Sequence, residues 1–373
     1  MSSTMNNSKS ESGEKSVRVN ILTEEQKLIA KQIFDHLAQE DTKSILLHCH
    51  PNPDPDSLGS VLAMKFALES IGKKVSVIAG DSKTPSAFNH FPGATEIIPQ
   101  NYFEIDLTKF DTFLILDSGS PSMVSRKDTV VFPPQVNPDL KTVVIDHHAS
   151  NEGYGDINLV ATQYVSTTEI VFDLLQEWSI SLTKEIATNL YVGLFTDGGG
   201  FRYDRISDHS FYMAGVLYSY NPEMLKVVEL LENSSSPKSV DFLGLALTQK
   251  KVCDIRTGTS TGKDKGSFVI SYISYEDVVR LGLTTDDIGG SNIVSHILKA
   301  VIGWNVTAIL IETTPGEVKC SFRTRDQVEF DVSKVALALG GGGHKAAAGA
   351  TVKMPISEAV GHVERVIREV LFN

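Results

Sequence analysis

Aspartate and histidine side chains gather where three short apolar segments of this sequence end. One segment, at residues 45–47, leads into a turn that carries His50, Asp54 and Asp56, with a proline on each side of Asp54 to stiffen the backbone. Two further apolar segments end on acidic or imidazole groups, and a last aspartate precedes a glycine turn. The candidate metal ligands are His50, Asp54, Asp56, Asp117, His147, His148 and Asp197.

These side chains are chemically suited to divalent cations. Carboxylates with a minority of imidazoles favour Mn²⁺ or Mg²⁺ over ions that prefer thiolates. Four carboxylates and two or three imidazoles exceed the needs of one ion, whereas two ions that share a bridging carboxylate would use them all. Two metals about 3.5–4 Å apart can hold a phosphoryl oxygen, generate hydroxide from water and stabilise the leaving oxygen. The pattern therefore predicts hydrolysis of a phosphate ester.

Each of these residues, taken alone, has a plainer explanation. An aspartate at the end of a strand is most often a helix N-cap or a turn former, and Asp56 precedes a helical segment as such a cap would. A single histidine is more often structural than a ligand. The metal interpretation is favoured because three clusters fall at the same edge of one predicted sheet.

The spacing of the apolar residues predicts an α/β fold. Almost uniformly apolar strands alternate with helices, which is typical of a doubly wound, mainly parallel sheet covered on both faces. Ligands of such sheets bind beyond the carboxyl ends of the strands, where the acidic clusters lie. Strands are expected at residues 45–47, 74–79, 113–116 and 142–145, and helices at 24–39, 58–71, 167–178 and 183–195.

A chain of 373 residues is long for one core, and the pattern divides it into two domains. Residues 1–16 are polar and are expected to form a disordered tail. Residues 17–233 form the N-terminal domain, and helices continue to about residue 254 through a linker at 233–237. Residues 238–373 form a smaller α/β domain, with strands expected at 268–272, 305–311 and 317–323 and helices at 275–281, 293–301 and 357–371.

The C-terminal domain contains a glycine-rich segment, LGGGGHKAAAGA, at residues 339–350. Such a run can be a flexible loop. Because His344, Lys345 and what reads as the start of a small-residue helix follow it, we expect main-chain N–H groups of Gly341, Gly342 and Gly343 to approach an anion. Arg323 and Arg325 alternate on the preceding strand, which predicts two guanidinium groups on one face for phosphate or base contacts.

The composition limits the classes of function. The net charge of −12 argues against a protein that coats long duplex nucleic acid, although it allows a small anionic substrate at a metal site. No apolar run approaches the roughly 18 residues of a membrane span. The three cysteines have no paired spacing, which favours a reduced, cytoplasmic setting. Cys49 adjoins His50, but a cysteine at a strand end is more often a small buried hydrophobe than a nucleophile.

Five motifs in this order resemble the DHH phosphoesterase superfamily. HPNPDPDSLGS, LDSGS, IDHH and TDGGGFRY are similar to its four catalytic motifs, and GGGGHKAAAG is similar to the signature of the DHH-associated C-terminal domain. The resemblance covers nearly the whole chain after the tail. It implies an active site in the cleft between the two domains.

The resemblance also implies a role for each residue. One ion would be held by His50, Asp54 and Asp117, and the other by Asp56, Asp117, His147 and Asp197, with Asp117 bridging. Among the residues it implies to be catalytic are Asp117, Asp146, which would orient a ligand, and His148, which would face the substrate phosphate. His344, the glycine loop and Arg323 would hold the substrate from the other domain. The ions would most often be Mn²⁺, with Mg²⁺ as the alternative.

The size of the chain resembles the branch of small oligoribonucleases and pAp phosphatases. The expected activity is therefore hydrolysis of short single-stranded RNA, pApA-like dinucleotides or pAp. Cyclic-dinucleotide phosphodiesterases share the two domains, and RecJ-type exonucleases carry a further domain that this sequence lacks. The alternative from another class is a nucleotide-binding regulatory protein without catalysis. A homodimer is implied by resemblance only.

Overall fold

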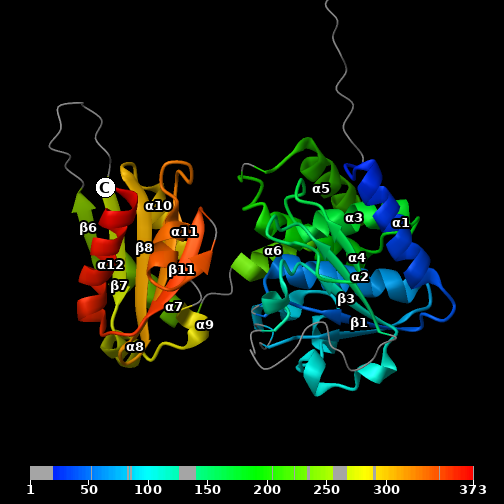
Figure 1. The fold of residues 1–373 in the computed structure, drawn as a ribbon, viewed down its shortest axis with the longest axis horizontal. Helices are drawn as coiled ribbons and strands as arrows, with labels where there is room; N and C mark the ends of the chain where they lie inside the picture. Colours follow the sequence, from blue (N-terminus) through cyan, green and yellow to red (C-terminus); the bar gives the residue numbers. More distant parts are fainter. Residues whose placement is uncertain are drawn as a thin grey trace, which may run out of the picture. The chain divides into compact units, whose positions relative to one another are not determined.

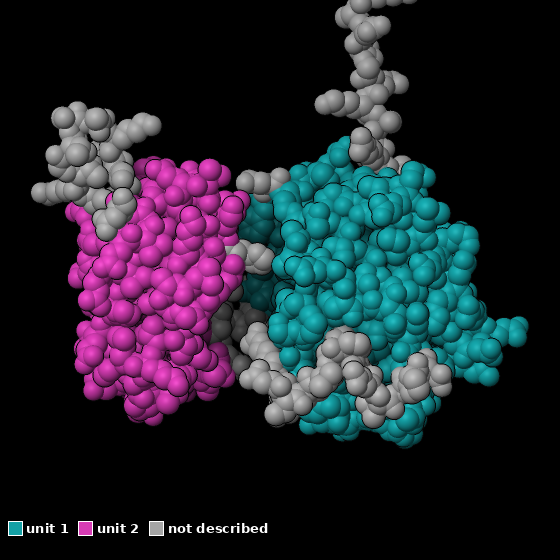
Figure 2. Space-filling view, in the orientation of Figure 1, with its two compact units in different colours: residues 1–233 teal, residues 234–373 magenta. Residues whose placement is uncertain are grey.

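The computed structural model describes residues 20–51, 53–81, 84, 86–125, 140–203, 205–221, 223–232, 236–254, 267–288, 291–343 and 345–372. The chain divides into two compact units, Met1–Asn233 and Ser234–Asn373 (Figure 2). The tail predicted at residues 1–16 lies outside the described residues, as do residues 233–235 of the predicted linker.

The described part of the first unit is built on a five-stranded, fully parallel sheet, as predicted. The strand order is β2-β1-β3-β4-β5, the order of a doubly wound fold. Every side chain of β3 is buried, which explains its uniformly apolar sequence, whereas burial alternates along β5 and left no such signal. The strands are β1 (Ser44–His48), β2 (Lys74–Ile78), β3 (Thr112–Leu116), β4 (Lys141–Asp146) and β5 (Ile157–Val160).

The two faces of this sheet are covered differently. Six α-helices share one apolar core with one face, through residues such as Leu58, Ile170 and Leu190 (Figure 1). Short 3₁₀ helices cover the other face, where Tyr102 and Phe113 pack. The helices are α1 (Glu24–Ala38), α2 (Pro55–Ser70), α3 (Thr167–Glu177), α4 (Lys184–Asp197), α5 (Asp208–Tyr220) and α6 (Met224–Glu232), and the 3₁₀ helices are η1 (Ser86–His90), η2 (Ala94–Glu96), η3 (Tyr102–Glu104), η4 (Leu107–Lys109) and η5 (Pro121–Met123).

The second unit contains a mixed sheet with an apolar core on each face. Its described strands run in the order β10-β11-β9-β8-β7-β6, and only β7 and β8 pair in parallel. Helices α11 and α12 pack on one face, and α7, α8 and α10 pack on the other. The strands are β6 (Lys250–Asp254), β7 (Ser267–Ile273), β8 (Trp304–Thr314), β9 (Glu317–Thr324), β10 (Gly342–Gly343) and β11 (Ala347–Val352), and the helices are α7 (Pro237–Thr248), α8 (Tyr275–Leu281), α9 (Thr285–Ile288), α10 (Ser291–Ala300), α11 (Val332–Ala338) and α12 (Ile356–Leu371).

Two predictions for the second unit were wrong. Helices do not continue to residue 254, because α7 ends at Thr248 and Lys250–Asp254 pair as β6 with β7. The glycine run is not followed by a helix, because residues 347–352 form β11 beside β9. Small residues suit this strand since the hairpin backbones nearly touch: a Cβ atom at Gly341 would lie 2.1 Å from the main-chain oxygen of Gly349. Among the described residues, no helix is long and apolar enough to span a membrane.

Helices α2 and α4 approach closely through glycines in the first unit. A Cβ atom at Gly59 of α2 would lie 2.4 Å from the main-chain oxygen of Asn189 in α4. A Cβ atom at Gly193 of α4 would lie 2.4 Å from the Thr168 side chain of α3. Since these neighbours include main chain, the helices themselves would have to separate to admit a methyl group.

We predict that Gly59→Ala destabilises the first unit by roughly 2 kcal/mol or more, because overpacking outweighs the gain in helix propensity. Gly215→Ala in α5, where nothing lies within 4 Å of the added atom, should instead stabilise the same unit by about 0.5–1 kcal/mol. The chain has two tryptophans, Trp178 and Trp304, one in each unit. In a Trp304→Phe background, urea titration followed by Trp178 fluorescence reports the first unit alone. Equal midpoints for the two alanine variants would contradict the packing argument.

Candidate metal centre

The first cluster of ligand atoms joins the β1–α2 turn to the end of β3. The Nε2 atom of His50 lies 3.7 Å from Asp54 Oδ2 and 3.6 Å from Asp117 Oδ2. These separations are too long for hydrogen bonds but ordinary for atoms that coordinate one ion. The Nδ1 atom of His50 lies 3.0 Å from the carbonyl oxygen of Pro51, which can only accept, so Nδ1 carries the proton. Burial opposes protonation of His50, but the nearby Asp54 carboxylate outweighs it and raises the pKa of the imidazole; a cation between Nε2 and the two carboxylates would take the place of that proton.

The second cluster joins α2, the end of β4 and the end of α4. The Nε2 atom of His147 lies 4.0 Å from Asp56 Oδ2 and 3.8 Å from Asp197 Oδ2. Burial, reinforced by the charge of neighbouring His148, lowers the pKa of His147 to about 4. The imidazole is thus neutral at physiological pH, the form that binds a metal.

Asp117 lies between the two clusters and contributes to both. Its Oδ2 faces His50, and its Oδ1 lies 3.5 Å from Nε2 of His147. Its side chain is almost fully buried, and its backbone adopts a φ of +55°, which is rare for a residue with a side chain. This unusual conformation occurs directly after β3 and coincides with a carboxylate that presents one oxygen to each ligand cluster.

Asp146 and His148 form a separate pair beside the ligands. The Nδ1 atom of His148 lies 2.7 Å from Asp146 Oδ1 and 3.7 Å from Asp117 Oδ1. Burial opposes protonation of His148, but the hydrogen bond and charge of Asp146 outweigh it and raise the pKa of the imidazole. Asn151 donates to the second oxygen of Asp146. In this structure Asp146 therefore orients His148, which together with Asp117 and His147 forms a further group of possible ligand atoms.

Local backbone structure explains how the acidic residues are held. Asp54, and not Asp56, is the N-cap of α2: its side chain accepts a hydrogen bond from the Ser57 N–H, and Pro55 occupies the first helical turn. Asp56 lies inside that turn with its carboxylate buried. The N-cap interpretation given above for Asp56 is thus wrong by two residues, because the helix begins before Leu58.

The N-terminus of α3 anchors two of the carboxylates. The N–H groups of Thr167 and Thr168 donate to Asp56 at 2.8 and 3.0 Å, and the Thr168 hydroxyl donates to it at 2.8 Å. The Thr167 hydroxyl donates to Asp117 at 3.0 Å. Helix N-termini stabilise negative charge, so α3 favours the ionised form of these groups. Sequence reasoning missed both threonines, and the only available signal was a Ser-Thr-Thr run at the start of a helix.

The carboxylates nevertheless repel one another strongly. Burial, followed by the charge of Asp54, raises the pKa of Asp56 to about 6. Burial and the charges of Asp56 and Asp54 raise the pKa of Asp197 to about 8, and burial with the surrounding carboxylates holds the pKa of Asp117 well above its usual range. Such a cluster fits divalent cations, which supply the missing positive charge, and the donor set of carboxylates and imidazoles fits Mn²⁺ or Mg²⁺.

Apart from His148, the residues predicted to bind substrate lie in the second unit. Arg323 is on β9, on the sheet face opposite α12, and Arg325 lies just beyond the end of that strand. Sequence reasoning did not select Lys299 of α10, which is under the electrostatic influence of both arginines. Burial, followed by the positive charges of Arg323 and Arg325, lowers the pKa of its amine. Gly341, Gly342 and Gly343 border the β10–β11 hairpin. His344 lies outside the described residues.

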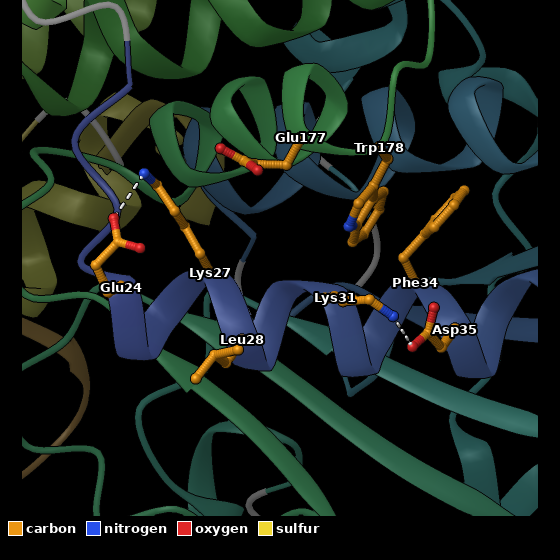
Figure 3. A pocket seen from close by; sticks show the side chains of 8 residues that line it. All are labelled: Glu24, Lys27, Leu28, Lys31, Phe34, Asp35, Glu177 and Trp178. Atoms are coloured by element: carbon orange, nitrogen blue, oxygen red, sulfur yellow. Dashed lines mark hydrogen bonds and ion pairs between the residues drawn. The ribbon is translucent and has the colours of Figure 1, made fainter.

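A groove of about 520 Å³ lies away from the metal centre, between α1 and the end of α3 (Figure 3). Its aromatic wall is Trp178 stacked on Phe34. Its two lysines pair with carboxylates of the same helix, Lys27 with Glu24 and Lys31 with Asp35. Because these pairs offset their charges, the groove does not offer the concentrated positive charge that a phosphate ligand requires.

Two protein-family models match the chain. The model of the DHH family, N-terminal domain, matches residues 44–194, and the model of the DHHA1 domain matches residues 266–371. The first match contains all the predicted metal ligands except Asp197, which lies three residues beyond it.

Curated relatives match over most of their length. The bifunctional oligoribonuclease and PAP phosphatase NrnA of Thermus thermophilus is 27% identical over 328 residues, which are 88% of this chain and 90% of that protein. The probable enzyme of the same name from Streptococcus mutans is 25% identical over 320 residues, which are 86% of this chain and 92% of that protein.

Solved structures agree on the fold. An exopolyphosphatase-related protein from Bacteroides fragilis superposes with a TM-score of 0.77 at 21% identity, over 92% of this chain and 96% of that chain. RecJ from Thermus thermophilus in complex with Mn²⁺ gives a TM-score of 0.50 at 14% identity, over 95% of this chain and 55% of that chain. The resemblance inferred from the five motifs is confirmed: the chain contains an N-terminal domain of the DHH family at residues 44–194 and a DHHA1 domain at residues 266–371.

Proposed function

We propose that this protein is a metal-dependent phosphoesterase that hydrolyses short oligoribonucleotides to mononucleotides and pAp to AMP. The observation that carries the proposal is the position of Asp117, whose two oxygens face two separate ligand clusters. The names of the relatives, oligoribonuclease and PAP phosphatase, support this substrate class. The net charge of −12 supports a small substrate over long duplex nucleic acid.

In the proposed centre, His50, Asp54 and Asp117 hold one divalent ion, and Asp56, Asp117, His147 and Asp197 hold the other. Two such ions, which we propose to be Mn²⁺, supply a water of lowered pKa and neutralise charge on the phosphate. Asp117 fixes the spacing of the two sites. The α3 N-terminus holds Asp56 and Asp117 in place before substrate binds.

His148 and Asp146 act on the substrate side of the centre. Asp146 fixes the Nδ1–H of His148, so the imidazolium is oriented by a charge-assisted hydrogen bond. The side chain of His148 is 23% exposed, so part of the ring is accessible to a phosphate oxygen. We assign His148 to phosphate contact, where a cation stabilises the charge that develops on the transferred group.

The second unit contributes binding groups in this proposal. Arg323, Arg325 and the glycine hairpin with His344 hold the nucleotide, and Lys299 adds positive charge beside the two arginines. The three cysteines, all buried free thiols, support a reduced cytoplasmic setting. Burial raises the pKa of Cys49 to about 12, so this thiol is not an activated nucleophile. A homodimer is part of the proposal on family grounds alone.

The alternatives differ in substrate. A cyclic-dinucleotide phosphodiesterase would hydrolyse cyclic di-AMP faster than pApA, and a RecJ-like exonuclease would prefer long single strands to dinucleotides. A time course on a 5′-labelled RNA ladder beside pAp and cyclic di-AMP separates these activities. A nucleotide-binding protein without catalysis would leave every substrate intact.

We predict that Asp117→Asn lowers kcat for pApA in Mn²⁺ by about 10³-fold or more, because both ions lose a shared ligand. The metal-free variant should be at least as stable as the wild type, since a repelled buried charge is removed. Asp35→Asn in the groove of Figure 3 is the matched control and should keep full activity. Activity of Asp117→Asn close to that of the wild type would refute the assignment.

Arg323→Ala is expected to raise KM for pApA by about tenfold while kcat changes little, since the guanidinium acts in binding and not at the metals. Arg365→Ala removes the same charge from α12, on the other face of the sheet, and should leave KM unchanged. Steady-state kinetics on both variants makes the comparison. Equal KM values would remove Arg323 from the site.

The raised carboxylate pKa values predict a pH-dependent stability for the chelator-treated protein. Above about pH 7.5 histidines are almost entirely neutral in the unfolded state, as His147 is in the folded state, whereas Asp117 and Asp197 still bind protons only when folded. The free energy of unfolding should therefore fall between pH 7.5 and 9, by about 1 kcal/mol after allowance for the partial exposure of Asp197. Buried Asp173, whose pKa is raised to about 7, adds to the same trend independently of metal.

Mn²⁺ binds the ionised carboxylates, so it should raise the melting temperature more at pH 8 than at pH 6.5. Thermal melts with EDTA or Mn²⁺ at both pH values measure this difference. In Asp197→Asn the pH dependence of the Mn²⁺ effect should shrink. A Mn²⁺ effect of equal size at the two pH values in the wild type would count against a metal site built on these carboxylates.

A further inference from the structure

A group of aromatic rings follows the metal centre along the chain. Phe201, in the turn after Asp197, stacks on Phe211 of α5 with ring centroids 5.3 Å apart and an interplanar angle of 22°. Phe195 of α4 supports Phe201 from the side, at 5.9 Å and 76°. Phe211 is 58% exposed, so its ring is supported on one side and open to solvent on the other. Such exposure is unusual for a large apolar ring in an ordered helix.

Tyr203 provides a second half-open ring in the same turn. The ring lies against Gly199: a Cβ atom at that glycine would lie 2.5 Å from ring atoms Cε1 and Cζ. Gly199 has a φ of +60°, and its N–H donates to the carbonyl of Thr196, so the turn is ordered. The Tyr203 N–H also donates to the carbonyl of Gly198. The side chain remains 45% exposed although its ring is fixed against the backbone.

Two arginines accompany these rings. Arg202 donates from Nε to the carbonyl oxygen of Gly199, and Arg205 donates to the carbonyl oxygens of Thr162 and Tyr164. Within the described residues neither guanidinium is paired with a carboxylate, and both side chains are exposed. On a chain with a net charge of −12, exposed arginines whose charge is not offset by a carboxylate favour an anionic partner.

The group is next to the proposed reaction centre. Asp197 is the last residue of α4, and Tyr203 packs on the glycine two residues after it. The charge of Arg205 acts on both Asp197 and His147, which places the guanidinium within electrostatic reach of the second ligand cluster. Helix α5, which carries Phe211, packs against α4 in the shared core (Figure 1).

We propose that Tyr203 and Phe211 form a platform on which a nucleobase of a single-stranded substrate stacks, with Arg202 and Arg205 facing its phosphates. Aromatic rings bind bases of any sequence through their faces, and arginines beside them track the backbone. This inference rests on the proposed function and deepens it. It makes the base, and not only the phosphate, a determinant of affinity, and it favours oligonucleotides over simple phosphate esters.

Binding measurements test the platform without relying on turnover. The dissociation constants of pApA and of its analogue lacking both bases are measured by calorimetry on the full chain, with Ca²⁺ present. Stacking is worth about 1–3 kcal/mol per base, so the wild type should bind pApA about 5- to 150-fold more tightly than the abasic analogue. In Tyr203→Ala/Phe211→Ala this ratio should fall toward one. Tyr203→Phe/Phe211→Tyr, which keeps both rings, should restore it.

Kinetics provide a second readout. The double alanine variant should raise KM for pApA by a similar factor and leave hydrolysis of bis(p-nitrophenyl) phosphate unchanged. Tyr220→Ala is the matched control, because this tyrosine is 49% exposed and lies on the opposite side of α5 from Phe211. It should behave as the wild type in both assays.

The outcomes separate the two proposals. Equal affinity of the wild type for pApA and the abasic analogue overturns the platform, whether or not the protein is an enzyme. Base-dependent binding without hydrolysis in Mn²⁺ supports the platform and refutes the proposed function. If the double variant turns a dimer into a monomer in analytical ultracentrifugation while its base preference persists, the rings form a contact between two copies and the platform is rejected.

Discussion

Repulsion among buried carboxylates is the constraint on which the first unit depends. Asp54, Asp56, Asp117 and Asp197 converge from three elements, and burial raises the pKa values of the last three. A protein that only needed to fold would not place these groups together, because Asp56 and Asp117 are buried beside other carboxylates and lose their water. The fold offsets part of this cost with the N-terminus of α3 and the threonine hydroxyls. Divalent ions at the proposed centre would offset the rest.

The parallel sheet and the positions of the acidic groups could be predicted from the sequence, for one physical reason. Strands buried on both faces must be uniformly apolar, so their ends are marked sharply by the first polar residue, such as Asp117 after β3. The carboxyl ends of parallel strands lie at one edge of the sheet. The parallel topology alone therefore predicts that the polar side chains at the strand ends lie close together. This reasoning needs no side-chain geometry.

The features that the sequence did not predict depend on which strands and side chains pair with one another and on the exact residue at which a helix begins. Strand β5 alternates between buried and half-buried residues, and β11 begins with four alanine and glycine residues, so neither has the apolar run of a core strand. The roles of Thr167 and Thr168 arise from hydrogen bonds to Asp56, more than 100 positions away, and to Asp117, 50 positions from Thr167; local sequence does not encode them. For the same reason the sequence did not identify His148 as the residue that Asp146 orients.

The glycine contacts between α2, α3 and α4 have an evolutionary consequence. Beyond its clash with Thr168, a side chain at Gly193 would crowd Asp56, since a Cβ atom there would lie 3.1 Å from Asp56 Oδ1. The distances within the acidic cluster therefore depend on how closely these helices pack. A substitution that separates the helices would also move the carboxylates. Divergence among descendants of such a protein is left to exposed side chains away from this helix crossing, such as Tyr203 and Phe211. Related proteins would then keep the reaction chemistry of the metal centre and differ in the substrates that they bind.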